Sequence, residues 1–358
     1  MKTILILVLV SVILTTMNQS AVSRVTTNIK ADEMTYASSV DGTAPLCANI
    51  CYPGDGKPKP IIVVMHGLGG GRNDVAKDIR DFAARGLFAV VPDMRGRGTS
   101  AGKFDCGGLD VYDIVDALLA AISRYPAEID KRNINIVGYS GGGANCFSVF
   151  VRFPDLFHVV APFFGVTDYG QWYHLTPQYN DLLKQAVGGT PEELPLNYAA
   201  RNTCPAAGNN RGAKLHIFYD EAETICPPVM DERFLETYHA AGLKNATVHI
   251  SRAGDAARWR HGYRTDNPML EKADDTLVNE IFAPLPDLSL PKKGTLTVCG
   301  YLVTRQFKIF IENGQRGVVR IEYDLTGKEP KITVKDNPAK LPVKVSFQTP
   351  FAFLKQPQ

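Results

Sequence analysis

A serine in the segment 138–142 is placed where it could act as a nucleophile. The sequence Gly-Tyr-Ser-Gly-Gly directly follows the apolar run 134–137, and small residues continue after it. In a strand–turn–helix of this kind, the flanking glycines permit a turn tight enough to project Oγ of Ser140 above the carboxyl end of a sheet. The backbone amide of Gly141 can then donate to an oxyanion. Because Gly-x-Ser-x-Gly also arises by chance in glycine-rich turns, it predicts nucleophilic catalysis only together with other motifs.

Three further motifs accompany this serine in a fixed order. His66-Gly67 follows an apolar run, Asp-x-Arg-Gly-x-Gly-x-Ser occupies residues 93–100, and Gly-Gly-Thr-Pro-Glu-Glu occupies residues 188–193. Together with the turn at Ser140, they resemble the α/β-hydrolase superfamily, and most of all its prolyl-oligopeptidase-like and dienelactone-hydrolase-like serine hydrolases, a branch that includes acetyl esterases. The resemblance covers about residues 31–282. It implies catalysis by serine, acid and histidine, in that chain order.

The resemblance implies where the acid lies. α/β-Hydrolases commonly carry Gly-x-x-Asp-x-x-x-Pro after a late strand, and here the predicted strand 215–219 is followed by Asp-Glu-Ala-Glu-Thr-Ile-Cys-Pro. Alignment through Thr224 and Pro227 puts the acid at Glu223, with Asp220 as the alternative. Either carboxylate could instead cap or charge-stabilise the helix that follows.

The base and the second oxyanion donor are expected in two other loops. His261 lies in the loop after the predicted strand 246–250, whereas the other histidines fall within or at the start of strands, on a helix, in an insertion or in the loop after the run 60–65. We therefore predict that His261 accepts the serine proton. The backbone N–H of Leu68 is the candidate oxyanion donor, paired with that of Gly141. His66 is expected to hold this loop rather than to act as a base.

The glycine-rich segment 93–100 predicts a compact loop beside the site. We expect Arg95 or Arg97 to brace it through an ion pair with Asp93. The alternative is an arginine that binds substrate.

The sequence also departs from the family pattern in ways that bear on the substrate. Peptidases of this branch often carry an aromatic residue after the nucleophile, where this chain has Gly141, and dienelactone hydrolases use a cysteine in place of Ser140. The sequence shows no β-propeller before the predicted domain. We therefore expect a hydrolase of carboxylic esters, acting on a small-molecule or glycan-linked ester. The alternatives are a serine exopeptidase of the dipeptidyl- or aminopeptidase type and an inactive binding protein with the same fold.

A sheet must position these residues, and the hydrophobic pattern predicts one. Short β-branched runs alternate with amphipathic stretches, which is typical of a largely parallel sheet covered on both faces. Strands are expected at 33–36, 45–51, 60–65, 87–91, 134–137, 158–164, 215–219 and 246–250, and helices at 74–85, 109–124, 228–241 and 266–282. The predicted fold class is α/β, with an α/β-hydrolase domain over residues 30–286.

Two segments depart from this alternation. Between residues 167 and 210 we expect either a lid or pocket insertion, with Trp172 and Tyr173 as substrate-pocket candidates, or a surface excursion that packs on its own aromatics. From 290 to 352 the pattern predicts a small all-β, sandwich-like module that packs against the hydrolase domain. Its strands are expected at 295–303, 306–312, 317–324, 331–335 and 343–347, with hairpin-like turns at 312–314 and 326–327.

Composition and the N-terminal segment restrict the class of protein. The chain has 358 residues and a net charge of +2, which argues against nucleic acid as a partner. Residues 1–23 read as a cleaved secretory signal, because the apolar run 4–14 is short for a spanning helix. We therefore expect a secreted or periplasmic protein with no membrane contact beyond its export signal, and the alternative is an uncleaved N-terminal anchor.

The cysteines and histidines do not have the spacing of a zinc site, so neither a metal nor another cofactor is expected. Seven cysteines allow disulfides and leave at least one thiol unpaired. Cys47 and Cys51 are expected on one strand, about 13 Å apart, which is too far for a bond between them.

Overall fold

The computed structural model describes residues 28–255, 261, 268–327 and 329–354. Its larger unit is built on an eight-stranded sheet whose strands β1 and β2 are antiparallel and whose strands from β4 onward run parallel to one another. The strands, in spatial order, are β1 (Ile29–Tyr36), β2 (Leu46–Pro53), β4 (Phe88–Pro92), β3 (Lys59–Met65), β5 (Ile129–Tyr139), β6 (Val159–Phe163), β7 (Lys214–Asp220) and β8 (Ala246–Ser251). The predicted α/β class, with a largely parallel sheet, is confirmed.

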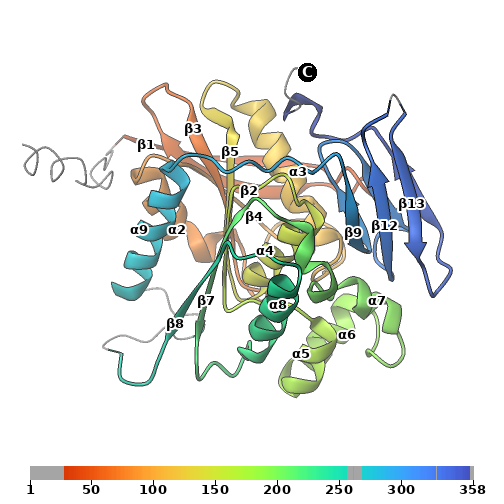
Figure 1. Ribbon diagram of the computed structural model, residues 1–358. Coiled ribbons are helices and arrows are strands. Elements are labelled where there is room, and N and C mark those ends of the chain that lie inside the picture. The colour runs from red at the N-terminus through yellow and green to blue at the C-terminus, as the bar shows by residue number, and fades with distance from the viewer. Residues whose placement is uncertain (1–27, 256–260, 262–267, 328, 355–358) are drawn as a thin grey trace, which may run out of the picture.

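Helices cover both faces of this sheet (Figure 1). The helices α2 (Ala76–Ala84) and α9 (Pro268–Phe282) lie together on one face. An ion pair at 3.3 Å joins Arg85, at the end of α2, to Asp275 on α9. The helices α3 (Leu109–Arg124), α4 (Gly141–Arg152) and α8 (Val229–Ala240) cover the other face, where the ring of Phe234 packs 4.8 Å from that of Phe147. The short 3₁₀ helix η1 (Arg72–Val75) precedes α2.

The segment between β6 and β7 is a helical insertion. It contains α5 (Tyr169–Leu175), η2 (Pro177–Tyr179), α6 (Asn180–Val187), α7 (Pro195–Ala200) and η3 (Cys204–Asn209). Asp168 caps α5, because its Oδ1 accepts from the backbone N–H groups of Gly170 and Gln171. In Figure 1 these helices lie at the end of the sheet from which the loops that follow β7 and β8 leave.

The C-terminal module is one antiparallel sheet bent at Gly300 into two three-stranded halves that share a core. The strands, in spatial order, are β13 (Lys331–Asp336), β12 (Val318–Asp324), β9 (Lys293–Cys299), β10 (Tyr301–Val303), β11 (Lys308–Ile311) and β14 (Val343–Ser346), and η4 (Ala352–Leu354) follows them. The hairpin predicted at 326–327 is confirmed, since β12 pairs with β13. The hairpin predicted at 312–314 is wrong: β11 and β12 lie in different halves, and β12 pairs with β9 instead.

Two fully buried arginines connect the module to the larger unit. Arg152 donates to the backbone carbonyls of Cys299 and Ala200 at 3.1 and 2.6 Å. Arg201 donates to Asp105 at 2.7 Å and to the carbonyl of Gln315 at 3.3 Å. Because a buried charge is tolerated only when it is paired and hydrogen-bonded, these contacts fix how the module sits on the sheet.

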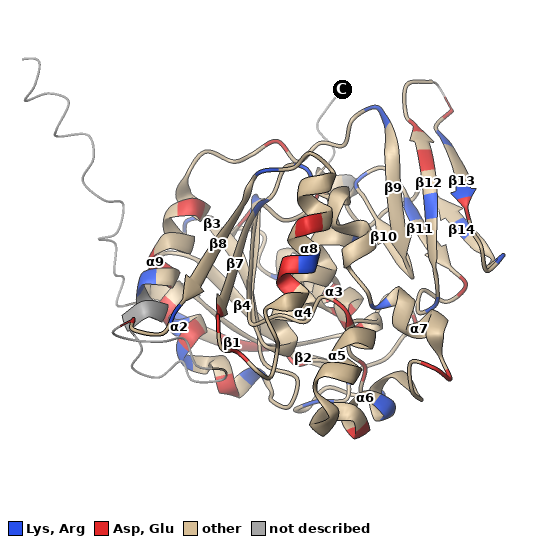
Figure 2. Ribbon diagram, turned by 60° about the horizontal axis from the view of Figure 1, so that its bottom comes forward, with Lys and Arg blue, Asp and Glu red and all other residues tan. Residues whose placement is uncertain are grey.

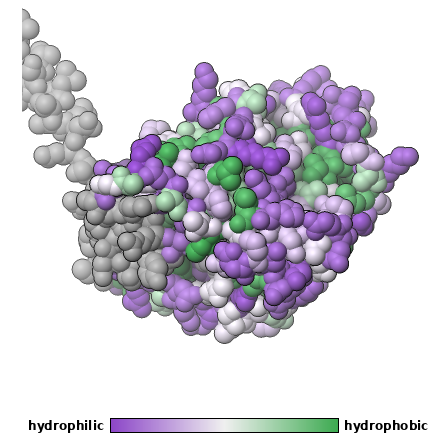
Figure 3. Space-filling model, turned by 90° about the horizontal axis from the view of Figure 1, so that it is seen from below, coloured by the Kyte–Doolittle hydropathy of each residue, from purple (hydrophilic) through white to green (hydrophobic). Residues whose placement is uncertain are grey.

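The remaining features of the chain are mostly those of an ordinary globular surface. Charges of both signs are spread over helices and strands (Figure 2). Apolar residues reach the surface in separate areas between polar ones when the molecule is seen from below (Figure 3).

All seven cysteines are buried free thiols. Within the described residues no helix is long and apolar enough to cross a membrane. The predicted signal segment lies outside the described residues.

Candidate active site

Ser140 lies on a strained turn between β5 and α4, as the glycine pattern predicts. Its φ and ψ are 57° and −118°, a left-handed conformation that non-glycine residues seldom adopt. A Cβ on Gly138 would lie 2.2 Å from the carbonyl oxygen of Gly142, and one on Gly142 would lie 2.4 Å from that of Met65. Both glycines are therefore required by the close approach of backbone on either side of the serine.

This crowding predicts a cost for enlarging the turn. We expect Gly142→Ala to lower the free energy of unfolding by about 1–3 kcal/mol, because the new methyl group must displace backbone of β3. The matched control is Gly69→Ala, since a Cβ there would have no atom within 4 Å. Urea denaturation of both variants is the measurement, and equal stability of the two would contradict the packing argument.

The structure brings the predicted nucleophile, base and acid together. Nε2 of His261 is 2.8 Å from Oγ of Ser140, and Nδ1 of His261 is 3.2 Å from Oε2 of Glu223. The side chains of His261 and Glu223 are 14% and 3% exposed, so the ring is reachable from solvent whereas the carboxylate is not. An imidazole held in this way can accept a proton from the serine while its other nitrogen donates to the carboxylate.

The loop between β7 and α8, residues 221–228, is called the acid loop because it carries Glu223. It holds the Glu223 carboxylate on the side away from His261. Oε1 accepts hydrogen bonds from the backbone N–H groups of Ile225 at 2.6 Å and Cys226 at 3.3 Å. Burial alone would raise the pKa of Glu223, but the hydrogen bond and charge of His261 and these amides bring the pKa below its ordinary value. The alternative acid, Asp220, accepts from Ser251 Oγ and from the amide of Ala222 and makes no hydrogen bond to His261.

The predicted oxyanion donors are adjacent. A Cβ on Gly141 would lie 2.7 Å from the backbone nitrogen of Leu68, so these two amides border one small space beside Ser140. Gly141 is the first residue of α4, and amides at this position have no acceptor within the helix. The Leu68 amide donates to no described residue. The same closeness accounts for glycine at position 141, because a side chain there would collide with the Leu68 loop.

His66 holds the Leu68 loop, as predicted. Its Nδ1 lies 2.8 Å from the carbonyl of Gly67, and its Nε2 accepts from the amide of Met94 at 3.1 Å. The ring is fully buried, and burial lowers the pKa of His66, which favours a neutral imidazole.

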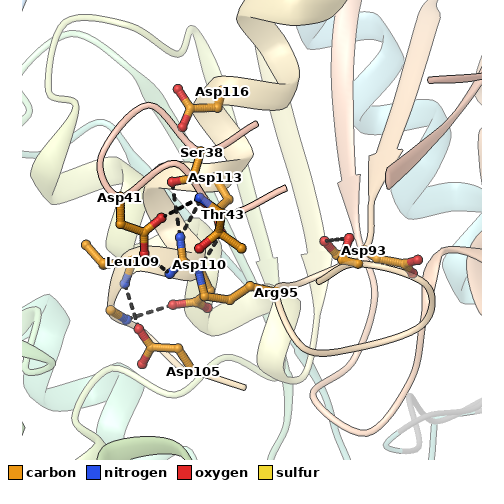
Figure 4. Close-up of polar contacts among 12 residues, drawn as sticks. Ser38, Asp41, Thr43, Asp93, Arg95, Asp105, Leu109, Asp110, Asp113 and Asp116 are labelled. Atoms are coloured by element: carbon orange, nitrogen blue, oxygen red, sulfur yellow. Dashed lines mark hydrogen bonds and ion pairs between the residues drawn. The ribbon is translucent and has the colours of Figure 1, made fainter. Parts of the chain in front are cut away.

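The expected brace between Asp93 and Arg95 or Arg97 is wrong. Asp93 pairs instead with Arg72, whose Nη1 lies 2.6 Å from Oδ2. Arg95 turns away to Asp113, at 2.6 Å, in the polar cluster of Figure 4. Arg97 makes no ion pair with a described residue, and its guanidinium lies 3.7 Å above the ring of Phe104. Arg72 precedes α2 and is remote in sequence, which is why local spacing pointed to the wrong arginines.

The structure corrects the expectation for Trp172, one of the two aromatic pocket candidates. Trp172 is 3% exposed and cannot offer its ring face to a substrate. Its ring stacks on Tyr179 at 5.0 Å, and its Nε1 donates to the carbonyl of Ile225 at 2.6 Å. Tyr173 is half-buried and packs edge-on against the rings of His174 and Tyr198. The insertion thus braces the acid loop through Trp172.

This brace predicts a measurable effect on the acid loop. Trp172→Phe keeps an aromatic ring but removes the donor to the part-buried carbonyl of Ile225. We expect a loss of about 1–3 kcal/mol in the free energy of unfolding and a lower kcat. Tyr173→Phe is the control, because Tyr173 is not bonded to the acid loop. Thermal unfolding and hydrolysis rates of both variants provide the test, and unchanged values for Trp172→Phe would show that the indole does not support this loop.

Two residues next to the nucleophile were missed by sequence reasoning. Phe164 adopts a φ of 53°, and its ring lies 5.5 Å from that of His261. Cys226 is buried beside Ser140; burial raises the pKa of its thiol well above the ordinary value, while a hydrogen bond with Ser140 acts in the opposite direction. Neither position carries a signal for a site residue: Phe164 falls at the end of the strand predicted at 158–164, just beyond β6, and Cys226 lies in a loop without a periodic pattern.

Comparisons with known proteins agree with this architecture. The sequence model of the prolyl oligopeptidase family matches residues 74–227, which include Ser140 and Glu223. An uncharacterized peptidase, YtmA, of Bacillus subtilis is 27% identical over 34% of this chain and 47% of its own length. Human protein ABHD8 is 28% identical over 28% of this chain and 22% of its own length. The matches thus span less than half the length of these curated relatives.

Solved structures share the fold. The acylaminoacyl peptidase of Pyrococcus horikoshii superposes with a TM-score of 0.59 at 21% identity, over 73% of this chain and 42% of its own. A puromycin hydrolase gives 0.55 at 21% identity, over 74% of this chain and 41% of its own. The acetyl xylan esterase from Paenibacillus sp. R4 gives 0.53 at 18% identity, over 71% and 84%. These likenesses, with the sheet and the turn at Ser140, show that the chain has the α/β-hydrolase fold.

Proposed function

We propose that this chain is a serine hydrolase that cleaves carboxylic esters. The observation that carries the proposal is the hydrogen-bonded series from Ser140 through His261 to Glu223, with distances of 2.8 and 3.2 Å. In this series Oγ attacks the acyl carbon while Nε2 of His261 takes the serine proton. The buried carboxylate orients the ring and stabilises the imidazolium that forms.

The rest of the reaction follows from the neighbouring backbone. The amides of Leu68 and Gly141 donate to the oxyanion of the tetrahedral intermediate, and one such donor typically contributes about 3–4 kcal/mol to the transition state. Collapse of the intermediate expels the alcohol, which takes its proton from His261. Water then attacks the acyl-serine with His261 again as the base, and Ser140 is regenerated.

The carboxylates of the insertion favour an ester over the free N-terminus of a peptide. An aminopeptidase needs a carboxylate that binds the substrate's amine. Asp168 is used by the α5 cap and by Asn202 at 2.8 Å, and Glu193 accepts from the amide of Thr190 at 2.8 Å. Glu192 is exposed and lies 3.4 Å from His174. Each of the three has its partner inside the insertion.

A peptidase is the second candidate function. The match of residues 74–227 to the prolyl oligopeptidase family favours it, as do the peptidases among the solved structures with this fold. An acylated N-terminus would need no carboxylate for a free amine, so this candidate is compatible with the paired state of Asp168, Glu192 and Glu193.

Unactivated substrates separate the two candidates, because activated nitrophenyl esters acylate serine peptidases as well. We would compare acetate release from an acetylated methyl xyloside with cleavage of N-acetyl-Ala-Ala and of Ala-Pro dipeptide amides, using Ser140→Ala as the blank. A higher kcat/KM for the sugar acetate supports the esterase, and a higher value for either peptide overturns it in favour of a peptidase. Failure of all substrates, together with no labelling of Ser140 by a fluorophosphonate, would identify an inactive binding protein.

We also propose that the protein is exported. The apolar N-terminal segment supports this, with cleavage after Ser23. N-terminal sequencing of the mature protein is the test. A mature chain that starts at Met1 would favour an uncleaved anchor instead.

A further inference from the structure

A groove of about 850 Å³ lies between the hydrolase unit and the C-terminal module. One wall comes from the β1–β2 connection at 39–41 and from the first turn of α3, and the other comes from β11, β14 and the chain at 348–350. None of its lining residues belongs to the Ser140 site. The volume is within the usual range for a ligand pocket.

The floor of the groove is aromatic. Phe310, which is half-buried, lies with its ring 5.9 Å from that of Tyr112 on α3 and 5.5 Å from that of Tyr301. The Tyr301 ring is nearly parallel to it, at 17°, and supports it from the module. The groove therefore offers an apolar ring whose position is fixed by two others.

The uncompensated charge of the groove is positive. Its two carboxylates are already paired, Asp41 with Arg95 at 2.8 Å and Glu312 with Arg316 at 3.0 Å. Lys308 and Lys344 line the same groove, and neither forms an ion pair with another described residue. A ligand that enters here meets two ammonium groups that are not paired with any described carboxylate.

The strand register places these two lysines around the aromatic ring. Phe310 pairs with Lys344 across β11 and β14, and Lys308 pairs with Ser346. Residues two apart on a strand share a face, so Lys308, Phe310 and Lys344 point to the same side of the sheet. Side chains that both donate and accept hydrogen bonds, among them Asn313 and Gln348, complete the lining.

The opposite wall is held in place by buried polar contacts (Figure 4). Arg95 donates to Asp41 at 2.8 Å and to Ser38 Oγ at 3.1 Å, while its ion pair with Asp113 is buried. The backbone N–H of Ser39 donates to Asp116 at 2.8 Å. A wall fixed in this way loses little conformational entropy when a ligand binds.

We propose that this groove is a non-catalytic binding site for a sugar chain that carries carboxylate groups. A sugar ring stacks its C–H face on the phenyl ring of Phe310, its hydroxyls meet the amide side chains, and its carboxylates meet Lys308 and Lys344. Hydroxyl-rich chains suit a lining of amides and hydroxyls better than an acidic peptide does, because a peptide presents fewer groups that both donate and accept. The proposal does not depend on which bond Ser140 cleaves.

The test is isothermal titration of the full-length protein with trigalacturonate, with a neutral galactotriose and with a tri-glutamate peptide. We expect binding of trigalacturonate that weakens with rising salt, as an exposed charge interaction must. The double variant Lys308→Ala/Lys344→Ala should bind it at least about tenfold more weakly. Lys331→Ala, an exposed lysine on the outer strand β13 of the module, is the control that should bind normally.

Each other outcome overturns the proposal. Equal binding of the neutral trisaccharide would remove the role of the lysines, preferential binding of the peptide would make this a peptide site, and no binding at all would show that the groove is not a sugar site. Hydrolysis of a small soluble ester by the double variant should match that of the wild type. In the wild type, absence of sugar binding with ester hydrolysis present would be a failure of this proposal, whereas sugar binding without hydrolysis would be a failure of the proposed catalytic function.

Discussion

Replacing Ser140 with alanine is expected to lower kcat for ester hydrolysis by about 10⁴–10⁶-fold, to the level left by binding and the oxyanion donors alone. The reason is geometric: Oγ of Ser140 is the atom that the ring of His261 contacts at 2.8 Å, and alanine leaves no nucleophile there. The measurement is the steady-state rate together with labelling by a fluorophosphonate, which should be absent from the variant. The fold should persist, because methyl in place of hydroxymethyl fits the same turn.

A second serine, on the helix that follows Ser140, provides the control. Ser148 lies on α4 with a buried hydroxyl that has no hydrogen-bond partner among the described residues. Ser148→Ala therefore removes the same group without touching the Ser140 site, and its rate should be close to that of the wild type. Retention of more than a tenth of the activity in Ser140→Ala would mean that another residue is the nucleophile.

The elements that position Ser140 could be predicted because their patterns are local. The helix predicted at 109–124 has the observed limits of α3, since four of its apolar residues recur at helical spacing and are fully buried: Val111, Ile114, Val115 and Leu118. The strand expected at 134–137 is longer, because β5 begins at Ile129 and pairs there with Lys59. The charged residues between Ile129 and Ile134 conceal this extension, which depends on a partner remote in sequence.

The incorrect predictions share one physical cause. Several residues are equivalent in their local sequence, and tertiary contacts determine which of them forms a given interaction. A turn at 312–314 has hairpin chemistry, yet the bend at Gly300 gives β12 a different partner. An aromatic residue in an insertion reads the same whether it faces a substrate or packs inward, and Trp172 packs inward. Asp93 could pair with any nearby arginine, and the fold brings Arg72 to it. In contrast, Glu223 could be proposed as the acid, with Asp220 as the alternative, because the resemblance supplies a motif that aligns through Thr224 and Pro227.

That identification leads to the second large effect. Glu223→Gln keeps the size and the acceptor for Ile225 but removes the negative charge and offers an N–H₂ group toward the ring, which favours the tautomer of His261 that cannot accept the serine proton. We expect kcat to fall by about 10³–10⁴-fold with KM changed much less.

The matched control is Asp220→Asn, at the end of β7 just before the loop that carries Glu223. Among its contacts with described residues are hydrogen bonds with Ser251 and the amide of Ala222. The variant should therefore lose stability but keep its rate within about tenfold, since it leaves the contact between Glu223 and His261 intact. Steady-state kinetics of both variants, with thermal unfolding to separate stability from rate, decide between the two carboxylates. Because the two side chains differ by one methylene and lie three residues apart, the comparison assigns the acid by its contact with His261 rather than by chain order. A large loss of activity in Asp220→Asn, with activity preserved in Glu223→Gln, would make Asp220 the acid. It would also require the loop to move during catalysis.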